Sequence, residues 1–404
     1  MDIDNALVID LETSINNVGE ESVGKNRASP FCADNKIVAV GWKWLGSTLS
    51  EHPHTVITRY NGWSPELFNF KIECLVGHNI KFDLLYMLQK GMPGVRKWFD
   101  GPGIVWDTQL AEYLLSGQSL LYPSLDYCSE KRGGTLKDDR IKEYWENGVK
   151  TEDIPKDQLI EYLKYDVENT DIVFKSQLLE AQERGMLPLL YSQMRALKAT
   201  IEMENNGLHF DSSGARKTSF AIDHALRGKY DELKKDMKII MNRMDMKDIN
   251  PMSNDQISIC LFGGQYKIRA DVCVFDDNNA IVKYKSGAKK GQIKTRKEDR
   301  YYKTVGLGAD SRRFGTASAK AGIYSTDNAT ITKIMAFYPL GSVANFCERL
   351  LHIREMSKDL NTYYIGYSNL VWPDGNIHGQ LNHCATATGR LASSAPNLQN
   401  ISGD

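Results

Sequence analysis

Hydrophobic and polar positions follow two different periods in the first half of the chain. Helical spacing covers about 82–90, where Gly91 ends the run, and about 155–185, where apolar residues recur every three or four positions. Apolar runs of strand length come earlier, at 6–11, 36–44 and 74–76. Because strands precede helices, this pattern predicts an α/β domain that ends near residue 188.

The second half is mostly helical in pattern. Gly263-Gly264 and a charged stretch mark residues 265–310 as an insertion, with strand-type runs at 272–275 and 280–284 followed by a charged tail. We therefore predict a helical domain over 189–375, interrupted by that insertion, and a final strand-and-loop unit over 376–404. The helices are expected at 189–206, 213–245, 327–336 and 341–363.

Composition limits the class of protein. The chain has 404 residues, 42% of them hydrophobic and 25% charged, which suits two or three globular domains. Its net charge of −1 means that any DNA-binding surface must be local. Seven cysteines without a Cys-x-x-Cys motif indicate reduced thiols. With no signal peptide and no apolar run of membrane-spanning length, we expect a cytoplasmic protein without membrane contact.

Two carboxylates stand at the end of the first predicted strand. Asp10 and Glu12 are two residues apart, so a strand places both on one face. Like charges at that distance repel unless water or a metal ion offsets them. The pair by itself fits a solvated strand end or a metal site.

Three further acids have ordinary explanations when each is taken alone. Asp83 fits the first turn of a helix, where a carboxylate is favourable. Asp166 shares a helix face with Tyr162, at the edge of the buried stripe, which is common in amphipathic helices. Asp107 precedes Thr108–Leu115 and is predicted to cap that helix.

Taken together, these blocks resemble a known constellation. Asp10-x-Glu12, Asn79-x-x-x-Asp83 and Tyr162-x-x-x-Asp166 resemble, in order and spacing, the three motifs of the 3′–5′ proofreading exonuclease in family A (Klenow-type) DNA polymerases. The resemblance implies a ribonuclease-H-like α/β fold and the tyrosine subclass of that nuclease group. It also implies two divalent metal ions, Mg²⁺ or Mn²⁺, as oxygen-only ligands favour.

The resemblance also implies roles for these side chains. Asp10, Glu12 and Asp166 would hold one ion, and Asp10 with Asp83 would place the second. Tyr162 would orient the attacking water, and Asn79 would support the substrate. The expected product is a deoxynucleoside monophosphate released from a DNA 3′ end.

Later segments resemble the DNA-gripping parts of the same family. Leu197–Asp211 and Asn250–Phe262 resemble the thumb. His383–Ile401, rich in Thr, Ser, Asn and Gln around one Arg, resembles the block that opens the palm. By resemblance, Arg390 would reach the minor groove near the primer terminus, where an Arg can sense pairing geometry. Asn397 and Gln399 would contact primer or template.

The insertion is locally basic. Between Lys283 and Lys303 nine Lys or Arg face two acids, so either it contacts phosphates, through residues such as Lys289, Lys290 and Lys294, or it is a solvated loop. The plainest family A thumb lacks such an insertion, which favours a phage-like replicative enzyme with a possible accessory factor here. On a late helix, Arg354 and Lys358 are four apart and fit either duplex contact or solvation.

The family's palm carboxylates lie further along than Asp404. We therefore expect the N-terminal portion of a split or truncated family A DNA polymerase in DNA replication, with a complete proofreading site and a thumb. Primer–template and single-stranded DNA would be its partners, and a companion polypeptide would complete palm and fingers for polymerisation. If phage-encoded, it would act in the host cytoplasm. The alternatives are a non-polymerising DNA-binding or assembly subunit and a free-standing 3′–5′ repair exonuclease.

Overall fold

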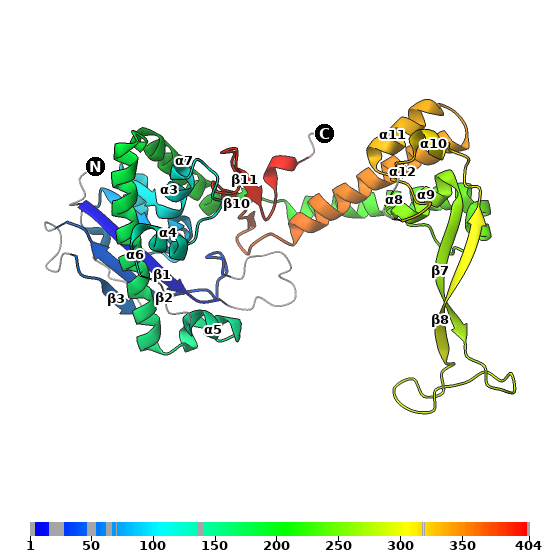
Figure 1. Cartoon of the computed structure of the whole chain (residues 1–404), viewed down its shortest axis with the longest axis horizontal. Helices are drawn as coiled ribbons and strands as arrows, with labels where there is room; N and C mark the ends of the chain where they lie inside the picture. The colour runs from blue at the N-terminus through cyan, green and yellow to red at the C-terminus, as the bar shows by residue number, and fades with distance from the viewer. Residues whose placement is uncertain are drawn as a thin grey trace. The chain divides into compact units, whose positions relative to one another are not determined.

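A computed structural model describes residues 5–15, 28–46, 54–61, 67–69, 71–135, 140–316, 318 and 320–401. The chain forms two compact units (Figure 1). The first combines residues 1–212 with 367–404, and the second is 213–366. Among the described residues, no helix has the length and apolar character needed to cross a membrane.

A mixed five-stranded sheet is the centre of the first unit. Its strand order is β3-β2-β1-β4-β5, with β1, β2 and β3 antiparallel and β4 and β5 parallel to β1. The strands are β1 (Ala6–Thr13), β2 (Ile37–Trp44), β3 (Ile57–Tyr60), β4 (Cys74–Gly77) and β5 (Ile104–Asp107). Three of them confirm the predicted apolar runs, whereas β3 and β5 were not predicted.

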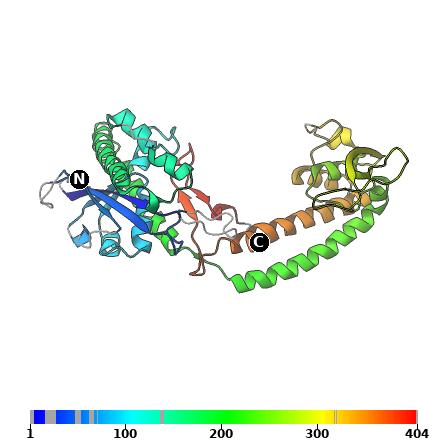
Figure 2. The ribbon, with the colours of Figure 1, turned by 90° about the horizontal axis from the view of Figure 1, so that it is seen from below.

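Helices lie on both sides of this sheet (Figure 2). The longest, α6 (Lys156–Glu183), contacts β1, β2 and β3, and Gly41 in β2 lets it approach closely, since a Cβ there would meet Leu163 Cγ at 2.8 Å. α1 (Ile80–Gln89) contacts β1 and β5, and α7 (Leu187–Asn206) contacts α1 and β5. Further helices among the described residues of the unit are α2 (Val95–Asp100), α3 (Thr108–Leu115), α4 (Leu125–Arg132), α5 (Arg140–Glu146) and the short η3 (Leu67–Asn69) and η4 (Thr151–Asp153).

The division between the units differs from the predicted boundary at 188. α7 was expected to begin the helical domain, but its buried residues, which include Leu190, Met194 and Ile201, belong to the core of the sheet unit. The last segment also belongs to this unit. It contains β9 (Asn376–Ile377), which pairs with β6 (Leu208–His209), then β10 (Gln380–Asn382) paired with β11 (Ala392–Ser394), and η6 (Leu398–Asn400).

The second unit is built from helices and one long hairpin. Its described helices are α8 (Ser212–Arg243, whose first residue belongs to the first unit), α9 (Asn254–Phe262), α10 (Ser311–Phe314), α11 (Asn328–Phe337), α12 (Ser342–Asp359) and the π-helix η5 (Leu360–Gly366). They share an apolar core of their own that includes Leu233, Met237, Ile257, Phe346 and Leu350.

The insertion is strand-rich as predicted, but its strands lie elsewhere. β7 (Gly264–Cys273) pairs along its whole length with β8 (Thr295–Thr304), the stretch that was expected to be a charged tail. The predicted run at 280–284 contributes only isolated bridges. Opposite charges pair across the two strands, directly in Asp271–Lys297 and diagonally in Lys267–Asp299, both at 2.7 Å, and such cross-strand pairs favour a charged strand.

Candidate active site and nucleic-acid interface

The end of β1 presents two of the predicted carboxylates. Glu12 is buried and Asp10 is partly buried, and a register shift follows Glu12 where β1 pairs with β2. β1 is otherwise apolar and lies in the middle of the sheet. The strand therefore holds both acids on a rigid element.

The third carboxylate arrives from α6. Asp166 is 6% exposed and lies where α6 crosses β1. One oxygen from each of Asp10, Glu12 and Asp166 can be chosen so that all three lie within 4.8 Å of one another. The structure thus brings together three of the four predicted metal ligands, although Asp10 and Asp166 are 156 residues apart in sequence.

Asp83 borders this group from α1. Its Oδ1 accepts a hydrogen bond from the Leu11 amide at 3.1 Å, between the two acids of β1. Burial raises the pKa of Asp83 well above its ordinary value, and the negative charge of Asp10 raises it further. Asp83 and Asp10 are therefore close enough to repel each other, and a divalent cation with oxygen ligands fits the donor set of Asp10, Glu12 and Asp166.

Tyr162 lies one turn before Asp166 on α6, as predicted. Its ring is half-buried and meets the Trp145 ring edge-on, with the centroids 5.8 Å apart. The same neighbourhood contains Ile141 and Ile154. Tyr162 is thus placed beside α5, on the helix that carries Asp166.

Asp107 caps α3, which confirms the prediction. Its Oδ1 accepts from the amides of Gln109 at 2.9 Å and Leu110 at 3.3 Å. The same oxygen also accepts from the Asn79 amide at 3.0 Å, a contact that was not predicted. Burial raises the pKa of Asp107 to about 6. Asn79 has a left-handed backbone (φ 53°), which Asn tolerates better than most residues, and Asp107 ties it to β5.

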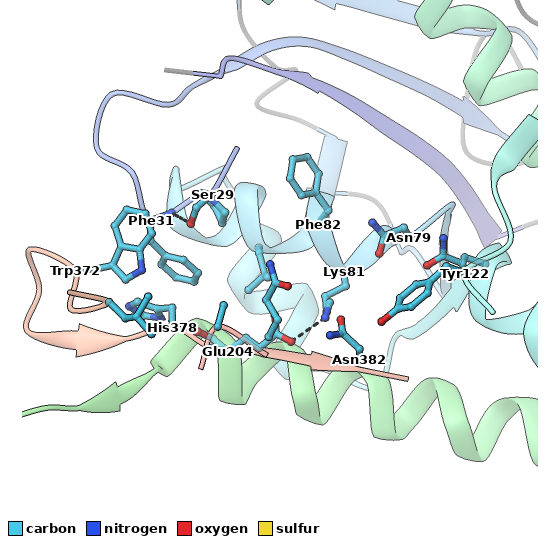
Figure 3. A pocket seen from close by; sticks show the side chains of 17 residues that line it. Ser29, Phe31, Asn79, Lys81, Phe82, Tyr122, Glu204, Trp372, His378 and Asn382 are labelled. Carbon is cyan, nitrogen blue, oxygen red and sulfur yellow. Dashed lines mark hydrogen bonds and ion pairs between the residues drawn. The ribbon is translucent and has the colours of Figure 1, made fainter. Parts of the chain in front are cut away.

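Asn79 also lines a cavity of about 270 Å³ in the first unit. Figure 3 shows Asn79, Tyr122 and Asn382 at one end of it and Phe31, Trp372 and His378 at the other. Amide and aromatic side chains dominate the wall. Such a surface suits flat, neutral groups with hydrogen-bonding edges, such as nucleobases.

An ion pair in the wall of this cavity was missed by the sequence analysis. Lys81 Nζ and Glu204 Oε1 are 2.8 Å apart, and both side chains are nearly buried (Figure 3). Glu204 also accepts from the Leu381 amide at 2.6 Å. The available signal was the position of Glu204 on the buried stripe of α7, four residues after Thr200 and three after Ile201.

The predicted DNA-contacting residues of the last segment are exposed. Arg390 and Asn397 face solvent, and Asn397 accepts from the Gln399 amide as the cap of η6. Gln399 donates to the Leu391 carbonyl at 2.9 Å. Thr386 anchors the segment, since its carbonyl accepts from the Tyr113 hydroxyl at 2.7 Å.

The predicted basic residues of the second unit have two different environments. Lys289, Lys290 and Lys294 are exposed beyond the paired part of the hairpin, and Lys358 is exposed on α12. Arg354 is half-buried and donates to three oxygens, those of the carbonyls of Pro251 at 2.9 Å and Thr326 at 2.5 Å and of the Asn328 side chain at 3.2 Å. The structure therefore gives Arg354 an internal bracing role.

The C-terminal region is similar in sequence to known DNA polymerases. Residues 301–404 match the profile of DNA polymerase family A. The thermostable DNA polymerase I of Thermus caldophilus is 42% identical over 83 residues, 20% of this chain and 9% of that protein. DNA polymerase I of Chloroflexus aurantiacus is 36% identical over 96 residues, 24% of this chain and 10% of that protein. The aligned part thus spans about a tenth of these relatives.

A solved structure resembles nearly the whole chain. It is the POL domain of Pol1 from M. smegmatis in complex with DNA primer-template and dNTP, with a TM-score of 0.59 and 15% identity, covering 98% of this chain and 52% of that one. At this identity the likeness concerns the fold. The sequence matches concern part of the chain, and over residues 301–404 the chain is similar to a DNA polymerase family A domain.

Proposed function

We propose that this protein is a 3′–5′ exonuclease that proofreads in DNA replication. The observation that carries the proposal is the convergence of Asp10, Glu12 and Asp166 within 4.8 Å, with Asp83 beside them. If the acids of the three motifs lay far apart in the structure, the resemblance of these motifs to a proofreading nuclease would be a coincidence. The strand order β3-β2-β1-β4-β5, with β2 antiparallel to its neighbours, supports a ribonuclease-H-like fold.

Each residue of the site would have a distinct role in the reaction. Asp10, Glu12 and Asp166 would hold one Mg²⁺ or Mn²⁺ ion, and Asp10 with Asp83 a second. Ions of this kind activate water and stabilise the leaving oxygen in phosphodiester hydrolysis. Tyr162 would orient the attacking water. Asn79 lies at the cavity of amides and aromatic rings, which would receive bases near the 3′ end.

We also propose that the chain binds primer–template DNA as part of a family A polymerase. The match over residues 301–404 supports this, and Arg390, Asn397 and Gln399 are exposed in that segment. Among the described residues, the group of three acids able to hold a metal ion lies in the sheet unit. We therefore assign nuclease chemistry to these residues and propose that nucleotide incorporation needs further palm and finger residues, in the same polypeptide or in a companion.

Strand polarity tests the proposal. A single-stranded oligonucleotide labelled at its 5′ end should shorten one nucleotide at a time with Mg²⁺ or Mn²⁺, and a phosphorothioate cap at the 3′ end should slow this strongly. Asp10→Ala should abolish it. Digestion that a 3′ cap leaves unchanged, or that Asp10→Ala leaves at the parental rate, would refute the assignment.

A further inference from the structure

We infer that Trp145 is a positioning residue for Tyr162, so that α5 serves the nuclease site. The inference rests on the proposed role of Tyr162 in the exonuclease. Its independent basis is a chain of contacts that begins outside the acidic group, at Thr151 in η4, and ends on the helix of Asp166.

The first link fixes the indole. Trp145 Nε1 donates to Thr151 Oγ1 at 3.2 Å. Thr151 is 1% exposed, at the start of η4. A buried hydroxyl that accepts from an indole N–H restricts both torsions of the tryptophan, because moving the ring would leave the donor without its partner.

The second link joins the indole to Tyr162. The two rings are perpendicular, with an interplanar angle of 87° and centroids 5.8 Å apart. This edge-to-face arrangement is one that aromatic pairs prefer, and it stabilises the pair beyond the effect of the area it buries. Both side chains are half-buried, so the tyrosine ring has access to solvent. The stack with Trp145 restricts its orientation.

The third link is the helix itself, because α6 carries both Tyr162 and Asp166. Tyr162 and Asp166 are four residues apart on α6 and share one helix face. α6 is anchored there by Leu159 and Leu163, both fully buried. Because the helix is fixed, the side-chain rotamer of Tyr162 determines where its hydroxyl lies. The contact with the Trp145 ring restricts this rotamer.

The local packing favours a specific role over simple coverage of the core. Ile141, Ile154, Leu159 and Val38 already form a buried cluster beneath these rings. Tyr144, on the same helix as Trp145, packs against that cluster too. Tyr144 therefore supplies a matched control, because truncating it removes aromatic packing from α5 without removing the stack of Trp145 on Tyr162 or its hydrogen bond to Thr151.

A double-mutant cycle tests the inference. Trp145→Leu should lower kcat about three- to tenfold and leave KM for single-stranded DNA unchanged, as expected if one edge-to-face contact is lost. In a Tyr162→Phe background, which lacks the hydroxyl, Trp145→Leu should have almost no further effect. Trp145→Phe, which keeps an aromatic ring but loses the donor to Thr151, should have a kcat between those of Trp145→Leu and the parent. Equal effects of Trp145→Leu with and without the hydroxyl would overturn the inference, as would an equal loss of kcat in Tyr144→Leu.

A second readout needs neither metal nor catalysis. With 3-fluorotyrosine at position 162, Trp145→Leu and Thr151→Val should both shift the fluorine resonance of the folded protein, whereas Tyr144→Leu should not. An unmoved resonance in Trp145→Leu would refute the positioning. Asp166→Ala separates the two claims. If Asp166→Ala leaves digestion of DNA unchanged, the nuclease assignment itself is wrong. If Asp166→Ala abolishes digestion but the effects of the Trp145 and Tyr162 substitutions on kcat are additive, only the positioning role of Trp145 is refuted.

Discussion

Lys81 and Glu204 form an ion pair at 2.8 Å that joins α1, the helix of Asp83, to α7. Lys81 lies between Asn79 and Asp83 on α1 and also donates to the Leu381 carbonyl at 3.0 Å. Glu204, on α7, accepts from the Leu381 amide. Both charges thus bind the same residue of β10, and the sheet and the last segment form one unit.

Removing one member of this pair should destabilise the first unit. Glu204→Ala leaves a buried ammonium without its counterion, which typically costs about 3–5 kcal/mol. The double variant Lys81→Met/Glu204→Leu removes both charges and should recover much of the loss. The check is the free energy of unfolding in urea for the three proteins. A Glu204→Ala protein as stable as the parent would show that the pair is not formed.

Asp107→Asn should change how stability depends on pH. The folded-state pKa of Asp107 is raised to about 6 from 3.8, so the folded protein binds its proton more tightly than the unfolded chain. The carboxylate therefore costs stability above pH 6, up to about 3 kcal/mol, and the cost disappears as pH falls towards 4. Asn retains the capping oxygen.

The measurement is the unfolding free energy of Asp107→Asn minus that of the parent at several pH values, without divalent metal. We expect a positive difference at pH 8 that declines to zero or below by pH 4. A difference that is independent of pH would contradict the burial of this charge. Asp107→Ala, which loses the cap, should be less stable than Asp107→Asn by about 1 kcal/mol.

Arg354→Ala should reduce stability more than it reduces DNA affinity. The guanidinium donates to two carbonyls and to Asn328, and hydrogen bonds from a charged group contribute about 1.5–3 kcal/mol. We expect the second unit to lose about 2 kcal/mol or more. Lys358→Ala, one turn later and exposed, should leave stability unchanged. If Arg354→Ala instead lowered DNA affinity and left the stability of the second unit unchanged, Arg354 would be a duplex-contacting residue.

Charge reversal in the hairpin tests whether its lysines contact phosphates. Each phosphate contact adds about 0.9 to the slope of log affinity against log salt on duplex DNA. Replacing Lys289, Lys290 and Lys294 with Glu should therefore flatten the slope measured on primer–template DNA. Reversal of the exposed Lys97 and Lys150, in the first unit, is the control. An unchanged slope in the hairpin variant would favour the solvated loop.

Much of the fold could be predicted because local pattern decided it. β1, β2 and β4 are buried on both faces, so their sequences are continuous apolar runs. α6 keeps one apolar stripe for 28 residues. By contrast, β3 and β5 have four residues each, too few to show a period, and their strand state comes from pairing with β2 and β4.

Contacts distant in sequence explain what could not be predicted. β8 is almost entirely charged or polar, and its partner β7 determines its conformation. The spacing of Asp10, Glu12, Asp83 and Asp166 indicated a common site, because motif resemblance carries long-range information. Lys81 and Glu204 have no such motif, so nothing in the sequence joined them across 123 residues.

The most direct test of the central claim compares two acids on one helix. Asp166 belongs to the group of three acids that could hold a metal ion, and Glu168, two residues later, is exposed. The measurement is the initial rate at which the purified protein releases deoxynucleoside monophosphate from single-stranded DNA with Mg²⁺. The account predicts that Asp166→Ala lowers this rate at least 100-fold and that Glu168→Ala keeps it within about twofold of the parent. Equal rates for Asp166→Ala and the parent would contradict it.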